Sequence, residues 1–456
     1  MLALLWRSSI TGSGTVNAKL VQQLEGEKRH WREVLKRVVA VITFLSERGL
    51  PFRGNDEVLG SPHNGNFLGI LEVISQFDPF LAEHINKYGQ KGRGSTSYLS
   101  STICEDLIKQ MGDKIKATIA AEIQQAKYFS VIVDSTPDLS HTDQLTFIFR
   151  FVSKEGKIIE RFVDFEPIES HTGESLANTV MTLLDSFSLD IANCRGQEYD
   201  NASNMSGRYN GLQAHLKKKN PLIHYIPCAA HSLNLVGVNS IEGSCQDASK
   251  FFDLMQSLYA FCAGSTHRWN IFFNNANIKL DMTLKSLSST RWSCRADASK
   301  ALCGNYAKIR EILPSISSDT GEKRDTRSEA AALCSKLGTL EAQFWHCILS
   351  RFKVTSESLQ KADMELMTAI HLFESLRSWV VSLRDQFDHF ETAAKNVPGV
   401  CQSYKDELQR VKKRKVFSDE STEHEVTLKG RERYQVETFN VIIDKLVSCL
   451  DHRVDA

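Results

Sequence analysis

The chain has 456 residues, of which 42% are hydrophobic and 24% are charged, a balance typical of folded globular proteins and not of disordered or collagen-like chains. At about 150 residues per domain, this length predicts roughly three domains. Lys plus Arg and Asp plus Glu each total 55, so the formal net charge is zero and no global field attracts nucleic acid or anionic lipid. Any nucleic-acid contact must therefore come from a local patch.

The cysteine pattern excludes a disulfide framework. The 11 cysteines lie between Cys104 and Cys449 with no C-x-x-C pair, and an odd number without that spacing favours a reducing compartment. The apolar opening from Met1 to Trp6 is too short for a signal sequence, and no later run approaches the length of a membrane span. We expect a soluble intracellular protein without membrane contacts.

The first part of the chain is predicted to be helical. After an unmatched segment, residues 1–26, apolar residues recur at helical spacing over residues 27–127. The expected elements are a helix from Glu27 to Gly49, a loop from Pro51 to Asn66, a helical stretch through Leu81, and a helix from Ser100 to Lys127 with Gly112 as a candidate break.

The pattern changes at Tyr128 to short β-rich runs. The expected order is strands at 128–133, 145–152 and 157–165, a helix at 173–187, a strand ending near 200, a helix at 206–218, a strand at 223–227 and a helix from 229. Three antiparallel strands followed by alternating helices and strands predict a mixed sheet covered by helices. We therefore predict an α/β ribonuclease-H-like core over residues 128–244.

Residues 245–456 show only helical periodicity and are predicted to form a large all-helical region. Two polar segments, Ser315–Arg327 and Gln409–Arg433, interrupt the pattern and are expected to be exposed loops.

Asp134 and Asp200 are the candidate catalytic residues. In the predicted fold, carboxylates at the end of the first strand and just after the fourth lie side by side, where they can hold two divalent cations about 3.5–4 Å apart for phosphoryl transfer. Their hard oxygen donors suit Mg²⁺ or Mn²⁺. Alternatively, Asp134 is a turn residue at a strand end and Asp200 caps a helix. The two residues alone leave both interpretations open.

Four segments carry a resemblance to a known family: FSVIVDST (129–136), CRGQEYDNASNMSG (194–207), CAAHSLNL (228–235) and STRWS (289–293). Together they resemble the hAT superfamily of DNA transposases, and within it the DUF4371 group of transposon-derived proteins similar to zinc finger MYM-type protein 1, over about residues 27–450. The resemblance implies a ribonuclease-H-like core split by a long helical insertion, and a D-D-E metal triad that cuts DNA. Asp134 and Asp200 match the first two acids.

The third acid of that triad follows the insertion in the family, in a region that also carries a dimerisation segment. Because Tyr434–Leu450 resembles the end of the insertion, we expect this glutamate beyond Ala456, and Glu432 and Glu437 are weak substitutes. The triad is thus expected to be incomplete and a family-type dimer doubtful. The resemblance also implies an N-terminal zinc-binding DNA-recognition module; we expect this chain to lack it and sequence-specific DNA binding to be weaker.

Cys228 and His231 form a C-x-x-H motif. No second ligand pair stands at a suitable distance, so no structural zinc is predicted. The resemblance places the pair beside the active site at a helix start, where His231 orients or neutralises DNA phosphates. The alternative is a half-buried cysteine with a helix-capping histidine.

Three further features are candidates for nucleic-acid contacts or targeting. Arg291 and Trp292 match a family position where the tryptophan stacks on a base near the cut site, whereas a core tryptophan is the alternative. The run Lys217–Lys219 ends a helix, where cations favourably meet the helix dipole. A basic run in a predicted loop reads as a nuclear signal or as a solvated loop: Lys412, Lys413, Arg414 and Lys415.

The sequence therefore predicts a transposon-derived protein of the nucleus, or of nucleus and cytoplasm, that is catalytically inactive and binds nucleic acid or protein partners. An active metal-dependent DNA transposase or nuclease is the alternative, and an unstable fragment is the third.

Overall fold

The structure is a computed structural model that describes residues 15–89, 97–138, 142–242, 246–274, 278–287, 292–337, 341–396, 404 and 428–454. The chain forms two compact units, residues 1–122 and 123–456. Among the helices in these described ranges, none is both long and apolar enough to cross a membrane.

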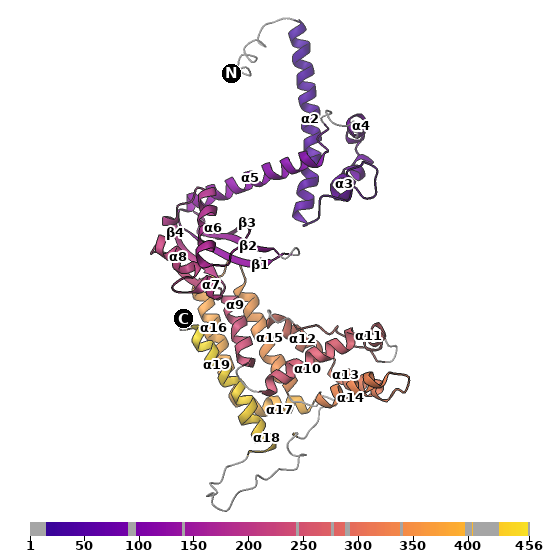
Figure 1. Cartoon of the computed structure of the whole chain (residues 1–456), viewed down its shortest axis with the longest axis vertical. Helices are drawn as coiled ribbons and strands as arrows, with labels where there is room; N and C mark the ends of the chain where they lie inside the picture. Colours follow the sequence, from indigo (N-terminus) through magenta and orange to yellow (C-terminus); the bar gives the residue numbers. More distant parts are fainter. Residues whose placement is uncertain are drawn as a thin grey trace, which may run out of the picture. The chain divides into compact units, whose positions relative to one another are not determined.

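The first unit is built from helices, as the sequence predicts (Figure 1). Its described helices are α2 (Thr15–Glu47), α3 (Gly65–Ser75), α4 (Pro79–Tyr88) and the first part of α5 (Ser101–Ala126). α5 runs through Gly112 without the expected break. Val38 and Leu45 of α2 pack with Leu71 of α3 and Leu81 of α4 in one apolar core. The spacing of these residues gives α2 the apolar face that this core requires.

The second unit begins with a five-stranded mixed sheet. Its strands are β1 (Phe129–Pro137), β2 (Asp143–Val152), β3 (Ile158–Pro167), β4 (Cys194–Tyr199) and β5 (His224–Pro227). They are arranged in the order β3-β2-β1-β4-β5. The pairs β1–β2 and β2–β3 are antiparallel, whereas β1–β4 and β4–β5 are parallel. The predicted α/β class with a mixed sheet is therefore confirmed.

The two faces of the sheet differ in polarity, because side chains alternate along each strand. Buried Val131, Val133 and Phe149 lie on the apolar face, which is covered by α6 (Gly173–Ser186) and α8 (Leu212–Lys219). The Phe149 ring meets Phe187, just after α6, at a centroid distance of 5.6 Å. The opposite face bears the charged and polar residues of the candidate site.

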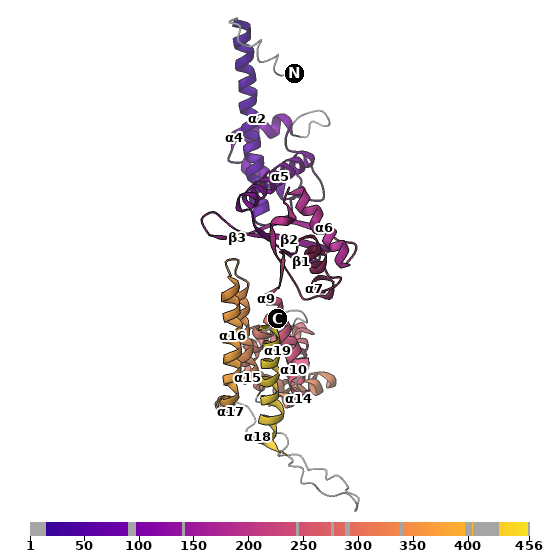
Figure 2. The same ribbon diagram turned by 90° about the vertical axis from the view of Figure 1, so that its left-hand side faces the viewer.

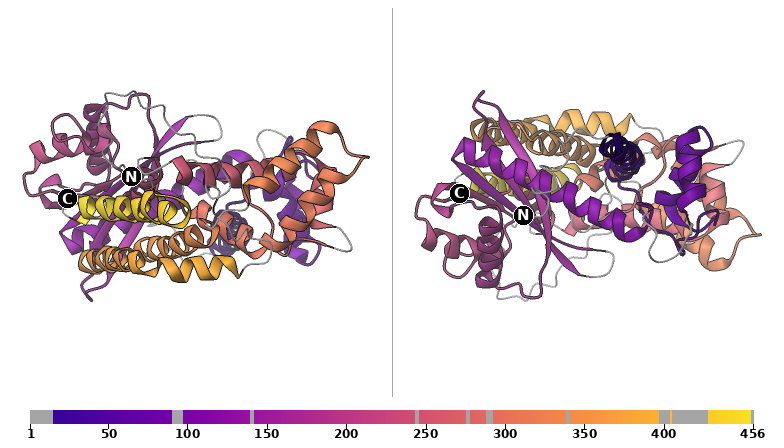
Figure 3. Two further views of the ribbon diagram at one scale, coloured as in Figure 1. Left: turned by 90° about the horizontal axis from the view of Figure 1, so that it is seen from below. Right: turned by 90° about the horizontal axis from the view of Figure 1, so that it is seen from above.

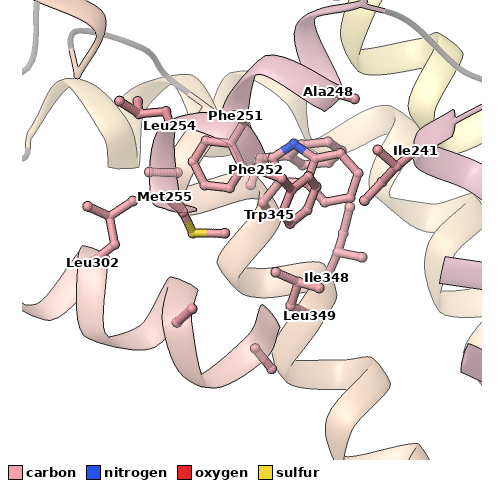
Figure 4. Close-up of a cluster of buried hydrophobic side chains, with 14 of the residues drawn as sticks. Ile241, Ala248, Phe251, Phe252, Leu254, Met255, Leu302, Trp345, Ile348 and Leu349 are labelled. Atoms are coloured by element: carbon pink, nitrogen blue, oxygen red, sulfur yellow. The ribbon is translucent and has the colours of Figure 1, made fainter. Parts of the chain in front are cut away.

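From Ala229 onward, the regular elements of the described chain are helices. They are α9 (Ala229–Glu242), α10 (Gln246–Ala263), α11 (Thr266–Phe273), α12 (Trp292–Gly304), α13 (Tyr306–Ser318), α14 (Arg324–Lys336), α15 (Glu341–Leu359), α16 (Leu366–Ser382), α17 (Phe387–Lys395), α18 (Gly430–Arg433) and α19 (Asn440–Val454). Several run side by side, with α19 alongside α16 (Figures 2 and 3). This block shares one large apolar core, in which Phe251 and Phe252 of α10 surround Trp345 of α15 (Figure 4).

The predicted polar loops are largely corrected by the structure. α13 continues through Pro314 to Ser318, and α14 already begins at Arg324, so only a short turn remains of the loop expected at 315–327. Ile316 in the last turn of α13 and Ala330 and Leu333 of α14 are buried in the core of the helical block, so apolar packing extends through both helices. Of the second expected loop, the described part from Gly430 onward is helical.

Candidate functional site

Asp134 lies inside β1, three residues before the strand ends at Pro137, and Asp200 directly follows β4, the parallel neighbour of β1. β1 and β4 pair so that Ile132 stands beside Glu198. Asp134 comes two positions after Ile132, and Asp200 comes two positions after Glu198. Residues two apart in a strand project from the same face. Both aspartates line one cleft of about 660 Å³. The structure thus brings together the two carboxylates that the sequence predicted to face each other.

The local surroundings of the two aspartates do not match the alternative in which Asp134 is a turn residue and Asp200 caps a helix. β1 continues past Asp134, which pairs with Thr146 of β2 within the ladder and not in a turn. Asp200 is not a helix N-cap, because Ala202 holds that position for α7 (Ser203–Ser206). Instead, Asp200 Oδ1 accepts the N–H of Ala202 at 3.0 Å, and the Asp200 carbonyl accepts the hydroxyl of Tyr225 at 3.2 Å. These bonds fix the turn that carries the carboxylate.

Cys228 and His231 line the same cleft. The N–H of Cys228 donates to the carbonyl of Tyr199 at 3.0 Å, which places the start of α9 directly against the end of β4. Burial, together with the negative charges of Glu198 and Asp134, raises the pKa of the Cys228 thiol to about 11. At neutral pH this side chain is a protonated thiol, which is a poor metal ligand and a poor nucleophile.

Two charged side chains on the floor of the cleft were not singled out from the sequence. Glu198 precedes Asp200 by two positions on β4, and burial raises its pKa whereas the nearby charge of Arg150 lowers it. Arg150 of β2 donates to Glu160 Oε1 of β3 at 2.6 Å. The two-residue spacing of Glu198 and Asp200 was the available signal, because it places both on one face of β4.

Arg150 also connects the sheet to the helical block. Its guanidinium donates to the carbonyl of Ala362 at 3.2 Å and to the carbonyl of Met364, both in the loop between α15 and α16. Residues of this loop, including Lys361 and Glu365, form the second wall of the cleft. The site is therefore bounded by strand ends on one side and by the α15–α16 loop on the other.

The carboxylates fit a divalent cation only in part. Asp134 and Asp200 supply the oxygen donors that Mg²⁺ and Mn²⁺ prefer. Within the described ranges, however, no three His, Cys, Asp or Glu side chains stand close enough together to hold one ion. Two carboxylates fall short of the three acids that the resemblance implies, so no bond-breaking step follows from these residues.

Trp292 is a core residue in the structure, and the expectation that it stacks on a base is corrected. Its side chain is 4% exposed and lies in the core of the helical block beside Phe252 and Trp345. A Cβ atom added to Gly237 of α9 would stand 2.4 Å from the indole, so the ring fits closely against that helix. An indole packed in this way presents no free face to a base. Neighbouring Arg291 lies outside the described residues.

The predicted nuclear signal also lies outside the described residues, so Lys412, Lys413, Arg414 and Lys415 receive no structural account.

Fold and site together define the class of this protein. It is an α/β domain with a polar cleft toward the carboxyl ends of its central parallel strands. Residues 9–211, which include both aspartates, match the DUF4371 family, described as ZMYM1/FAM200, RNase-like domain. This match confirms the DUF4371 part of the resemblance for residues 9–211, which contain the motifs at 129–136 and 194–207.

Two curated relatives bear the same name, 52 kDa repressor of the inhibitor of the protein kinase. The protein from Homo sapiens is 23% identical over 331 residues, which cover 69% of this chain and 42% of the relative. The protein from Mus musculus is 24% identical over 325 residues, which cover 68% of this chain and 42% of the relative. The chain therefore spans less than half the length of the curated relatives that it matches.

Proposed function

We propose that this chain is a hAT-transposase-derived nuclear protein that retains the ribonuclease-H-like core as a nucleic-acid-binding scaffold and does not cut DNA. The cleft carries the proposal: Asp134 and Asp200, which the resemblance aligns with the first two acids, both line it, and the described residues form no group of three ligands for one ion. The strand order β3-β2-β1-β4-β5 supports the ribonuclease-H-like assignment, and the family match supports the descent.

The chemistry of the cleft is consistent with binding without cleavage. In-line phosphoryl transfer needs cations that neutralise the developing charge on the leaving oxygen. Without a complete ligand set, the two carboxylates have no cation to offset their repulsion of a phosphodiester, because like charges at short range are unfavourable. The thiol of Cys228 is protonated at neutral pH and supplies no nucleophile. A nucleic acid would therefore be held by cations around the cleft and not by its carboxylates.

Incubation of purified protein with supercoiled plasmid and Mn²⁺ or Mg²⁺ tests the catalytic part of the proposal. The matched variants are Asp134→Ala and Asp200→Ala. We expect neither the parent chain nor the variants to nick the plasmid above buffer controls. Nicking by the parent chain that both substitutions abolish would overturn the proposal in favour of the second candidate, an active metal-dependent nuclease.

A direct binding assay tests the other part. We expect labelled DNA or RNA to bind the parent chain with an affinity that falls as salt rises, because neutralised phosphates release counterions. Asp134→Ala and Asp200→Ala should leave binding intact or strengthen it, since each removes a negative charge beside the backbone. A folded chain with no salt-dependent retention of any nucleic acid would refute the binding role.

A further inference from the structure

A second cavity, of about 350 Å³, adjoins the cleft and gathers cations from three separate segments. Arg208 follows α7, Lys217 lies in the last turn of α8, and Arg453 lies in the last turn of α19. Pro227 lines both the cavity and the cleft, so the two are neighbours. Residues up to 245 positions apart (453 − 208) thus contribute positive charge to one small space.

The cations of this cavity have no acidic partners in the part of the chain that the structure describes. None of the ion pairs there involves Arg208, Lys217 or Arg453, and no carboxylate lines the cavity. Three like charges around one cavity repel one another, and a bound anion removes that repulsion. The C-terminal dipole of α8 favours a cation at Lys217, but it does not explain why Arg208 and Arg453 line the same cavity.

The walls of the cavity are held by neutral hydrogen bonds. Gln213 of α8 donates to the carbonyl of Ser206, and the Ser206 hydroxyl donates to the carbonyl of Asn201 at 3.0 Å. Asn201 in turn donates to the Ser232 hydroxyl at 3.1 Å. Because these polar groups satisfy one another, the cavity is formed in advance and its cations remain available to a ligand.

The size and donors of the cavity fit phosphate groups. Its volume is near the lower end of the about 300–1,000 Å³ range of ligand pockets, which accommodates a phosphate with an attached sugar but not a large apolar ligand. Arg208 and Arg453 each offer the planar fork that binds phosphate oxygens in pairs. His224, on β5, also lines the cavity.

An exposed aromatic side chain directly follows one of these cations in the chain. Tyr209 directly follows Arg208, and 84% of its surface is exposed. A tyrosine with free ring faces beside phosphate-binding cations is the combination by which proteins bind single-stranded nucleic acid, because bases stack on the ring while the backbone follows the charges. Bases in a duplex are already stacked and are not available to such a ring.

We propose that this cavity binds backbone phosphates of single-stranded nucleic acid through Arg208, Lys217 and Arg453, with a base stacked on Tyr209. The proposal rests on the proposed function and adds to it a binding site outside the carboxylate cleft. Since Tyr225, which lines the cavity, also donates to the carbonyl of Asp200, a strand seated there continues toward the cleft.

Salt-dependent binding of the full chain to a labelled oligothymidylate of about 12 nucleotides tests the proposal. The test variant combines Arg208→Ala, Lys217→Ala and Arg453→Ala. The matched control combines Lys323→Ala, Arg324→Ala and Lys336→Ala, which remove three exposed cations at the ends of α14, away from α7 and α8 (Figure 1). Circular dichroism and thermal melting verify that both triple variants are folded.

The expected result is a change in the salt slope that only the test variant shows. Single strands contribute about 0.7 to the slope per phosphate contact, so losing three contacts makes the slope shallower by about 2 and weakens binding about 100-fold at 0.1 M salt. Tyr209→Ala should weaken binding about 5- to 150-fold without changing the slope, and Tyr209→Phe should retain it. The control variant should retain the parent slope.

The remaining outcomes separate this proposal from the proposed function. If the parent chain binds and the test variant keeps its slope, the cavity proposal is wrong and the general binding role stands. If duplex binds more tightly than single strands, or Tyr209→Ala has no effect, the stacking assignment is wrong. If the parent chain binds no oligonucleotide but tripolyphosphate raises its melting temperature, and not that of the test variant, a free polyphosphate compound is the ligand and nucleic acid is refuted.

Discussion

Replacing Gly237 of α9 by alanine tests whether the Trp292 indole belongs to the core. The added Cβ would stand 2.4 Å from Cδ2 and 2.5 Å from Cε2 of the indole, whereas carbon atoms pack best at about 3.5–4.0 Å. The ring is 4% exposed and packed beside Trp345, so it has little room to move. Overpacking of this kind costs about 1–3 kcal/mol, and alanine recovers about 1 kcal/mol of helix propensity over glycine. We expect a net destabilisation of about 1 kcal/mol and at most about 2 kcal/mol.

The same substitution at Gly112 is the control. Gly112 lies inside α5, and nothing stands within 4 Å of a Cβ added there. Gly112→Ala should therefore stabilise its helix by about 1 kcal/mol, whereas Gly237→Ala should destabilise the chain. Urea unfolding followed by tryptophan fluorescence measures Gly237→Ala, and hydrogen exchange of the α5 amides measures Gly112→Ala.

A stabilising Gly237→Ala would show that the indole does not lie against α9, and the base-stacking interpretation of Trp292 would regain support. The double variant provides an independent check. In a Trp292→Leu background the clash is absent, so Gly237→Ala should be less costly than in the parent chain, with a coupling energy of about 0.5–3 kcal/mol. Additive effects would refute the contact.

Three further predictions concern titratable groups. Burial lowers the pKa of His84, which is 0% exposed and whose Nδ1 lies 3.1 Å from Nε2 of His30. Because the unfolded chain then binds more protons than the folded chain, acid favours unfolding, and the α4 amides should lose protection from hydrogen exchange as pH falls from about 6.5. His84→Gln should reduce that loss. Burial raises the pKa of Glu391, but hydrogen bonds from Lys395, Tyr404 and Arg431 outweigh it and bring the pKa to about 2. This depressed pKa stabilises the second unit by on the order of 3 kcal/mol above pH 4.5, and that stabilisation is lost as pH falls through about 2. Glu391→Gln should lower the free energy of unfolding by this amount in urea at pH 7. An unchanged urea midpoint would contradict the prediction. Since the pKa of the Cys228 thiol is about 11, iodoacetamide should alkylate it slowly at pH 7.5 and faster with each unit of rising pH, as peptide mass spectrometry measures; rapid labelling at pH 7.5 in the folded chain would refute the assignment.

The order of helices and strands in the described chain could be predicted from the sequence, because it depends on local periodicity. Apolar residues every third or fourth position produce helices, and runs of β-branched and aromatic residues produce strands. The neighbourhood of Asp134 and Asp200 also needs the strand order. Because β1 and β4 are adjacent and parallel and Ile132 pairs with Glu198, the two aspartates lie near each other on one face of the sheet. The sequence pattern predicts that the first strand ends at residue 133, whereas β1 continues to Pro137.

Other features depend on contacts between distant residues, and local pattern does not contain them. Whether Trp292 is buried is decided by the absence of a side chain at Gly237, 55 positions earlier (292 − 237). The cavity beside the cleft exists because α19 brings Arg453 to the end of β5, so its three cations cannot be grouped from the sequence alone. Glu198 likewise shares one cleft with the α15–α16 loop, which Arg150 joins to the sheet and which lies more than 160 positions later in the chain. Packing free energy depends on which surfaces meet in three dimensions, and only the tertiary structure decides that.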